Sequence, residues 1–128
     1  MIIYGVGTDI VNVKRIEKIM RKNINFKKRI FSANEIINCE KRKNKYSCYA
    51  NRFASKEAFS KALGLGISKG LSFNEICVSN NKLGKPALII KGKSLKTVIK
   101  ILKKKRFKTF LSISDENPFS ISTVILTI

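Results

Sequence analysis

Apolar side chains recur at helical spacing in the first half of the chain, and this spacing predicts three helices. From Val13 onward the apolar residues face one way and the basic residues the other, which predicts a short helix with one basic face. Residues 32–35 match a capping box, so a second helix is expected to start there. The strongest pattern covers residues 46–63, where every fourth residue from 50 to 62 is alanine and permits close packing. Gly64 supplies the left-handed residue that ends this helix.

Runs of β-branched and apolar residues, separated by turn residues, predict strands at both ends of the chain. Residues 2–11 carry two glycines and one carboxylate in an otherwise apolar run and are expected to form a buried strand. Further strands are expected at residues 73–79, 87–91, 107–114 and 121–128. Ser94 is expected to cap a last helix between the two resulting hairpins. Early helices and late hairpins indicate an α+β fold and not a doubly wound parallel one.

The composition indicates one folded domain, residues 1–128, with a partner of opposite charge. Of the 128 residues 44% are hydrophobic, and only 7 are Gly and 2 Pro, which favours a globular chain over a disordered one. There are 27 Lys and Arg residues against 8 Asp and Glu, giving a net charge of +19. Such a charge is typical of proteins that bind nucleic acid, a membrane surface or an acidic protein. The abundance of Lys, Asn and Ile also suggests a compositional bias as the cause of part of the charge.

The absence of histidine excludes several kinds of catalytic site. A Ser-His-Asp or Cys-His nucleophile and a histidine-ligated zinc site are all impossible. Cys39, Cys48 and Cys77 are odd in number and have no CxxC spacing, so neither a zinc ribbon nor a closed disulfide framework is expected. No stretch approaches the roughly 20 apolar residues of a membrane span. We therefore expect a cytoplasmic protein that is not inserted in a membrane.

The placement of a few carboxylates suggests chemistry on a phosphate ester. Asp9 lies in an apolar strand, where burying its carboxylate is costly unless a cation or a hydrogen-bond donor contacts it. The alternative interpretation is that Asp9 caps the helix that follows. Glu57 and Lys61 lie four residues apart and share a helix face; the alternative is a surface ion pair contributing about 0.3 to 0.5 kcal/mol. Two carboxylates near lysines suit Mg²⁺, which is usually held by one or two carboxylates together with substrate phosphates. No nucleotide-binding glycine loop of the P-loop or dinucleotide type is present.

Three segments resemble one known family. Residues 5–11 followed by Arg15, the run from Arg52 to Gly64, and residues 83–86 are similar to holo-[acyl-carrier-protein] synthases, the small bacterial 4′-phosphopantetheinyl transferases. The resemblance implies an antiparallel sheet packed against a long helix. It also implies that 4′-phosphopantetheine passes from coenzyme A to a serine of apo acyl carrier protein, releasing adenosine 3′,5′-bisphosphate. Homotrimers are the usual assembly in this family.

The resemblance also implies roles for individual residues. Asp9 and Glu57 would bind Mg²⁺, and Lys61 would stabilise or protonate the leaving phosphate. Glu57 would act as the base, either directly or through a metal-bound water. The residues expected at the coenzyme A site are Arg52, Lys61, Gly64, Lys85, Pro86, Lys41, Arg42 and Lys43. The basic face expected to dock the acidic carrier protein comprises Lys14, Arg15, Lys18, Arg21 and Lys22.

One departure from the family pattern keeps two alternatives open. Phe110 stands where the family commonly has a histidine, so any role of that histidine is absent or relocated. An inactive homologue that only binds the carrier protein is therefore one alternative. A small basic nucleic-acid-binding module is the other, although it leaves Asp9 and Glu57 unexplained.

Overall fold

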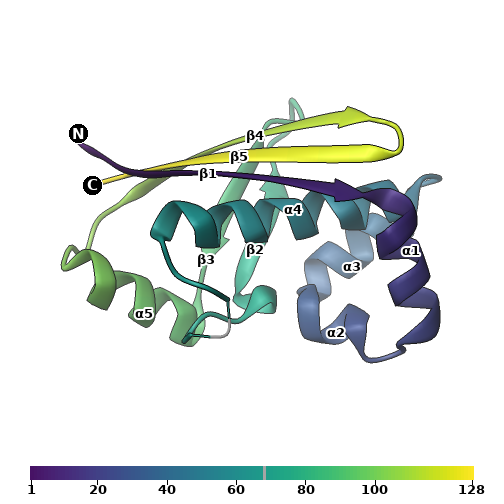
Figure 1. Cartoon of the computed structure of the whole chain (residues 1–128), viewed down its shortest axis with the longest axis horizontal. Coiled ribbons are helices and arrows are strands. Elements are labelled where there is room, and N and C mark those ends of the chain that lie inside the picture. Colours follow the sequence, from purple (N-terminus) through teal and green to yellow (C-terminus); the bar gives the residue numbers. More distant parts are fainter. Residues whose placement is uncertain (68) are drawn as a thin grey trace.

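A three-stranded antiparallel sheet lies along a long central helix. A computed structural model describes residues 1–67 and 69–128. The sheet has the strand order β1 (Ile3–Asn12), β5 (Phe119–Thr127) and β4 (Lys108–Glu116), and it runs along α4 (Lys45–Leu63) in Figure 1. The expected α+β class, with an antiparallel sheet against a long helix, is confirmed.

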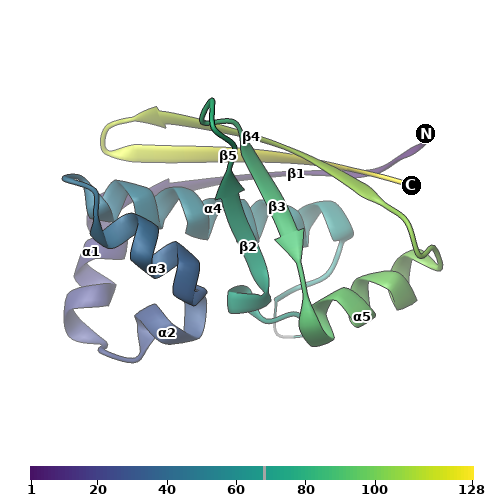
Figure 2. The same ribbon diagram turned by 180° about the vertical axis from the view of Figure 1, so that it is seen from behind.

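The other helices lie on the side of α4 away from the sheet, and a second hairpin runs past α4 to reach strand β4 (Figures 1 and 2). Near the start of α4 are α1 (Val13–Lys22), α2 (Phe26–Ile30) and α3 (Ala33–Glu40). A 3₁₀ turn, η1 (Phe73–Glu75), leads into the antiparallel hairpin β2 (Ile76–Asn80) and β3 (Pro86–Ile90), followed by α5 (Gly92–Leu102). The five-residue α2 was not predicted, and residues 73–75, predicted as strand, form the 3₁₀ turn instead.

Strand β1 approaches α4 so closely that its two glycines are required. A Cβ atom added at Gly5 would lie 1.9 Å from the carbonyl oxygen of Ala62, and one at Gly7 would lie 1.9 Å from that of Ala58. The alanine stripe of α4 therefore receives the backbone of β1. Only the inner face of β1 is covered, because Val6 is 57% exposed. The prediction of a wholly buried strand is wrong for that reason.

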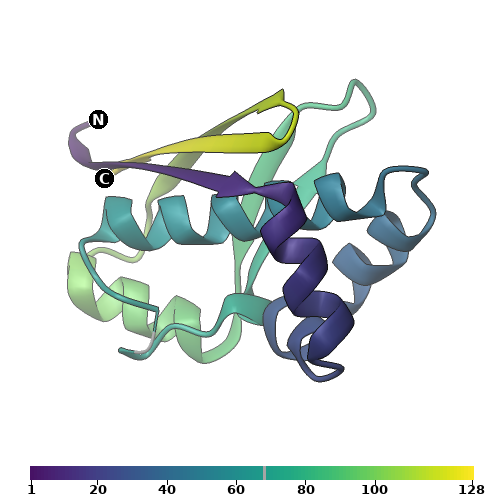
Figure 3. The same cartoon turned by 45° about the vertical axis from the view of Figure 1, so that its right-hand side comes forward.

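The core forms two clusters along α4. The first joins the C-terminal half of α4 to the sheet, β2, β3 and α5, and includes Phe59, Val98 and Val124. The second joins the N-terminal half of α4 to α1, α2 and α3, and includes Ile16 and Phe31. Seen from the side in Figure 3, α4 passes between the sheet and α5, with α1 at the other end.

Two of the three predicted helix ends are confirmed. The Ser32 hydroxyl accepts from the amide of Glu35, whose carboxylate accepts from the amide of Ser32 at 2.9 Å, which completes the capping box. Gly64 ends α4 with a φ of +81°. Ser94 is not a cap, because α5 already begins at Gly92, and the first turn of α5 is satisfied by Glu75, which accepts from the Ser94 amide at 3.1 Å.

The cysteines also depart from expectation. Helices α3 and α4 bring Cys39 and Cys48 to a Cα–Cα distance of 5.4 Å, and their sulfurs form a disulfide. The expectation of no closed disulfide is therefore wrong. The sequence separation of nine residues gave no indication of the pairing, since it depends on how the two helices pack. Cys77 remains a buried free thiol.

Within the described ranges, 1–67 and 69–128, none of the helices has the length and apolar character that crossing a membrane requires.

Candidate active site

Asp9 lies on the inner face of β1, directed toward α4. Its Oδ1 is 3.0 Å from Lys61 Nζ, which also donates to the Thr8 carbonyl at 3.0 Å. The cap of α1 is Asn12, whose side chain accepts from the Lys14 amide at 2.9 Å. The alternative interpretation of Asp9 as the helix cap is therefore wrong, and its carboxylate faces a cation across the junction of β1 and α4.

Glu57 lies one turn before Lys61 on α4 and shares this junction. Burial raises the pKa of Glu57, and the negative charge of Asp9 raises it further, while Lys61 and Arg15 act in the opposite direction. The carboxylates of Asp9 and Glu57 therefore repel each other across this junction. Among the described residues the ion pair of Lys61 is with Asp9, so the alternative of a simple Glu57–Lys61 surface pair is wrong.

The donor set fits Mg²⁺ and not a fully protein-ligated metal. The part of the chain that the structure describes contains no group of three or more His, Cys, Asp or Glu side chains able to hold an ion. Mg²⁺ commonly takes one or two carboxylates and completes its shell with water and substrate phosphates. Asp9 and Glu57 supply two carboxylates that repel each other, and a divalent cation would relieve that repulsion.

A pocket of about 590 Å³ opens beside these residues. Glu57, Lys61 and Gly64 line it, together with the apolar side chains of Ile67 and Phe73. A second cavity of about 510 Å³ shares Glu57, Ile67 and Phe73 with the first. The charged junction therefore borders an apolar groove.

Arg52 links two of the other predicted segments. Its side chain is only 2% exposed, its Nη2 donates to Asn80 Oδ1 at 3.1 Å, and its Nε has no partner among the described residues. Asn80 Nδ2 in turn donates to the carbonyl of Gly84, in the turn that precedes Lys85. The pKa of Arg52 is lowered, first by burial and then by the charge of Arg42. The hairpin turn thus reaches the guanidinium of Arg52 through Asn80, and the charge of Arg42 in the basic loop acts on the same group.

The basic side chains expected to bind ligands or partners occupy two exposed surfaces. Lys41, Arg42 and Lys43 lie in the exposed turn between α3 and α4. The basic face of α1, comprising Lys14, Arg15, Lys18, Arg21 and Lys22, is also exposed. Arg15 reaches the junction electrostatically, since it lowers the pKa of Glu57.

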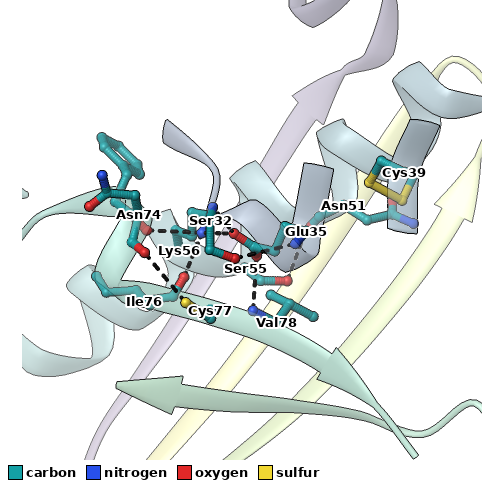
Figure 4. Close-up of polar contacts among 12 residues, drawn as sticks. Ser32, Glu35, Cys39, Asn51, Ser55, Lys56, Asn74, Ile76, Cys77 and Val78 are labelled. Atoms are coloured by element: carbon teal, nitrogen blue, oxygen red, sulfur yellow. Dashed lines mark hydrogen bonds and ion pairs between the residues drawn. A yellow bond between two sulfur atoms is a disulfide. The ribbon is translucent and has the colours of Figure 1, made fainter. Parts of the chain in front are cut away.

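A buried ion pair beneath the site was not predicted (Figure 4). Lys56 Nζ is 2.7 Å from Glu35 Oε1 and donates to the carbonyls of Phe73 at 2.9 Å and Ile76 at 2.6 Å. The other Glu35 oxygen accepts from the Val78 amide at 2.9 Å. Burial lowers the pKa of Lys56, and Glu35 opposes this. The pair ties α3 and α4 to η1, and so fixes Phe73 in the groove wall.

The sequence carried one signal for the Lys56 pair. Lys56 follows Arg52 by four residues and precedes Phe59 and Leu63 at helical spacing, so it lies on an inward face of α4. A lysine in that position needs a buried partner. The neighbouring charged residues make Lys56 look like a surface residue, so this need is easily overlooked.

Comparison with known proteins identifies the class. The model of the 4′-phosphopantetheinyl transferase superfamily matches residues 5–123. The chain therefore belongs to this superfamily. Proteins named holo-[acyl-carrier-protein] synthase from Pelagibacter ubique and Vesicomyosocius okutanii are 51% and 43% identical to it, each over 98% of both chains. Within the superfamily, the chain is a member of the holo-[acyl-carrier-protein] synthase family.

Solved structures agree with this assignment. The crystal structure of the Neisseria meningitidis synthase has a TM-score of 0.87 at 34% identity and covers 99% of this chain and 100% of its own. The Helicobacter pylori synthase in complex with coenzyme A has a TM-score of 0.79 at 33% identity, covering 95% and 99%. The expected family is confirmed, and the match favours a transferase over a nucleic-acid-binding module.

Proposed function

We propose that this chain transfers 4′-phosphopantetheine from coenzyme A to a serine of apo acyl carrier protein at the junction of β1 and α4. The observation that carries the proposal is the contact of Lys61 with Asp9 beside Glu57, in a chain whose relatives are named for this reaction. All of residues 1–128 are assigned to this one transferase domain. We also place the protein in the cytoplasm.

The chain's own residues supply the proton transfer and charge stabilisation. Glu57 accepts the proton of the carrier serine as its oxygen attacks the pantetheine-bearing phosphorus, and the bond to the second phosphate breaks. In the metal-free protein, burial and the charge of Asp9 raise the pKa of Glu57, which makes it a stronger base than an ordinary glutamate. The Lys61 ammonium stabilises the negative charge that develops on the leaving adenosine 3′,5′-bisphosphate and is placed to protonate it.

The proposed metal is Mg²⁺, held by Asp9 and Glu57. When bound it supplies positive charge that offsets the charge of the diphosphate. Lys61, which pairs with Asp9 at 3.0 Å, is then free to turn toward phosphate oxygen.

Coenzyme A is proposed to bind along the face that joins the groove to the two basic segments. The Helicobacter pylori synthase, a relative of this chain, has been solved in complex with coenzyme A. In this chain Lys61 and Gly64 line the groove beside the junction. The unpartnered Nε of Arg52 is a buried donor that a phosphate oxygen would satisfy. The 3′-phosphate and adenine are assigned to Arg52, Lys41, Arg42, Lys43, Lys85 and Pro86.

The basic face of α1 is the proposed docking surface for acyl carrier protein. Its exposed cations are complementary to an acidic partner, which raises the rate of encounter and orients the complex. The charge of Arg15, on this face, acts on Glu57, and we propose that a carrier docked on α1 brings its serine toward this base.

A homotrimer is proposed from the outer face of the sheet. Val6, Ile10 and Phe110 are 57%, 58% and 47% exposed, and Ile125 lies in register between Val6 and Phe110. No described element of the chain covers these side chains. Burial of this face against copies of the same chain would explain why a single chain exposes so many apolar side chains.

Intact mass spectrometry tests the function. Apo acyl carrier protein is incubated with this protein, coenzyme A and Mg²⁺, and a carrier whose serine is replaced by alanine serves as control. We expect one phosphopantetheine arm on the wild-type carrier and none on the control. No gain in mass on the wild-type carrier would reject the transferase function. An equal gain in excess chelator would reject the metal.

A further inference from the structure

A second basic surface lies at the opposite end of the molecule from α1. It is formed by the outer side of α5 and by the loop that joins α5 to β4. Its exposed cations are Lys96, Lys100, Lys103, Lys104, Lys105 and Arg106. Figures 1 and 2 show the C-terminal end of α5 at the same end of the molecule as both chain termini, with α1 at the other end. We call these residues the distal basic surface.

The charge of the distal basic surface is not balanced within the described part of the chain. None of the ion pairs found there includes one of its residues. No Asp or Glu occurs between Glu75 and Asp115 in the sequence, so α5 and the following loop have no carboxylate of their own. On α1, by contrast, Arg21 pairs with Glu17 at 3.0 Å. A group of unpaired cations that repel one another favours an anionic partner.

Exposed apolar side chains adjoin these cations. Met1, Ile2 and Ile3 are 83%, 68% and 63% exposed. Their backbone is held in place, because the Ile2 amide donates to the Ile128 carbonyl at 2.8 Å and the Ile128 amide donates to the Ile2 carbonyl at 2.9 Å. An open pocket of about 610 Å³ joins the two groups and is lined by Met1, Lys105, Arg106, Phe107, Lys108, Thr127 and Ile128. Cations and apolar side chains therefore share one surface.

The exposed apolar residues distinguish between the possible anionic partners. Single-stranded nucleic acids are bound by cations together with aromatic side chains on which the bases stack, whereas Met1, Ile2 and Ile3 are aliphatic. The acidic carrier protein is already assigned to the basic face of α1. A membrane surface with anionic lipids contacts both kinds of residue at once. Cations bind its headgroups, and aliphatic side chains enter the boundary between headgroups and acyl chains.

We propose that the distal basic surface binds the surface of a membrane that contains anionic lipids. Lys104, Lys105 and their neighbours contact the headgroups, and Met1 and Ile2 enter the boundary below them. Helix α5 lies on the side of α4 away from the sheet, so the trimer proposed from the outer sheet face leaves α5 uncovered (Figure 3). The basic face of α1, at the other end, stays open to the carrier protein. No residue of the proposed active site takes part, so the binding is measured without any assay of transfer.

Co-sedimentation with lipid vesicles tests the binding. One set of vesicles contains phosphatidylcholine alone, and the other contains phosphatidylcholine mixed with the anionic phosphatidylglycerol. We expect the protein to sediment with the mixed vesicles, to remain in solution with phosphatidylcholine alone, and to bind the mixed vesicles less tightly in added salt. Absence of binding to the mixed vesicles at low salt would overturn the proposal.

Charge-matched variants test whether the binding belongs to this surface or to the net charge. Lys104→Gln with Lys105→Gln should weaken binding to the mixed vesicles about 25-fold, since each basic residue near an anionic surface contributes about fivefold. Lys18→Gln with Lys22→Gln removes the same charge from α1, is the control and should change little. Circular dichroism should show an intact fold in both variants. Equal losses from the two pairs would mean that the net charge binds without a defined surface, which rejects the proposal.

A second pair of variants tests the apolar contribution. Ile2→Ser should weaken binding to the mixed vesicles about three- to tenfold, as partial burial of one large apolar side chain implies. Ile24→Ser is the matched control, because Ile24 is 89% exposed in the loop after α1, away from the distal basic surface. Unchanged binding by Ile2→Ser would mean that the contact is purely electrostatic and would reject the membrane as the specific partner.

Competition with RNA separates the membrane from a nucleic acid. Protein bound to the mixed vesicles is challenged with single-stranded RNA at a phosphate concentration equal to that of the anionic lipid. We expect most of the protein to stay on the vesicles, because RNA offers no apolar boundary to Met1 and Ile2. Release of the protein into a complex with RNA, weakened by Lys104→Gln with Lys105→Gln but not by Ile2→Ser, would assign the surface to nucleic acid and reject the membrane.

Discussion

At the scale of single residues, the site depends on a strand carboxylate and a helix carboxylate that share one lysine. Asp9 pairs with Lys61, whereas Glu57, one turn away, has a raised pKa and no ion pair among the described residues. The two carboxylates therefore have different environments. This difference suits Asp9 to balancing positive charge and Glu57 to proton transfer.

Glu57→Gln should reduce turnover by roughly 10²- to 10⁴-fold, because the amide cannot accept the serine proton. Asp9→Asn should reduce it by a similar amount through loss of metal and of the Lys61 contact. Circular dichroism and thermal melting should show an intact fold in both variants. Glu116→Gln, at an exposed carboxylate on β4, should keep full activity. Retention of wild-type turnover by Glu57→Gln would remove Glu57 from the reaction.

The pH dependence should reveal the environment of Glu57. Burial and then Asp9 raise its pKa, so the carboxylate is lost on acidification at a pH above the usual glutamate value of about 4.3. In the metal-free protein, a carboxyl group whose pKa is higher in the folded state than in the unfolded state stabilises the fold. This stabilisation is complete below the unfolded-state pKa and is lost as the pH rises through the folded-state pKa. The melting temperature of the wild type relative to Glu57→Gln should therefore fall as the pH rises above about 4.3, the unfolded-state value. A flat difference would contradict the raised pKa.

At the scale of elements, the contact between β1 and α4 sets the geometry of the site. Gly7→Ala would place a methyl group 1.9 Å from the Ala58 carbonyl oxygen, so β1 must move away from the helix. We expect a loss of about 3 kcal/mol or more in the free energy of unfolding, measured by urea denaturation. Gly66→Ala is the matched control, because nothing lies within 4 Å of the added Cβ. Equal effects of both substitutions would mean that the approach of β1 is not tight.

The two basic regions outside the site should differ in function. Lys18→Glu with Lys22→Glu reverses charge on α1 and leaves Arg15 in place beside Glu57. We expect the KM for acyl carrier protein to rise in the variant, while the KM for coenzyme A stays unchanged. The KM of the wild type for the carrier should itself rise with added salt, because salt screens exposed charges. Lys103→Glu with Lys104→Glu, after α5, is the control and should change little. Equal effects of the two pairs would indicate a diffuse field and no docking face.

Patterns within one element were predictable, and contacts between elements were not. The alanine spacing and Gly64 defined α4 because both act within a few residues. The pairing of Cys39 with Cys48 depends on the packing of two helices, and Glu75 reaches the start of α5 from outside that helix. For the candidate site, the motifs indicated Asp9, Glu57 and Lys61. They gave no indication that Lys61 would pair with Asp9.

At the scale of the whole molecule, the open face of the sheet predicts the assembly. Light scattering should give about three times the chain mass of 14.5 kDa. Val6→Lys with Ile10→Lys would place charge on this face and should give a smaller mass, since burying unpaired charges is costly. Ile24→Lys is the control, because Ile24 is 89% exposed in the loop after α1. A monomer at working concentration in the wild type would contradict the trimer.

The close approach of β1 to α4 also determines how the site responds to heat. Asp9 is carried by the strand and Glu57 by the helix, and the two backbones meet where Gly7 faces Ala58. Their separation is thus set by main-chain contact and not by adjustable side chains. One core cluster contains Val11 of β1 together with Ala50 and Ala54 of α4, so both elements are lost together when that cluster melts. The active site should therefore keep its geometry until the whole fold unfolds. Activity at high temperature should be lost at the same rate as the folded structure.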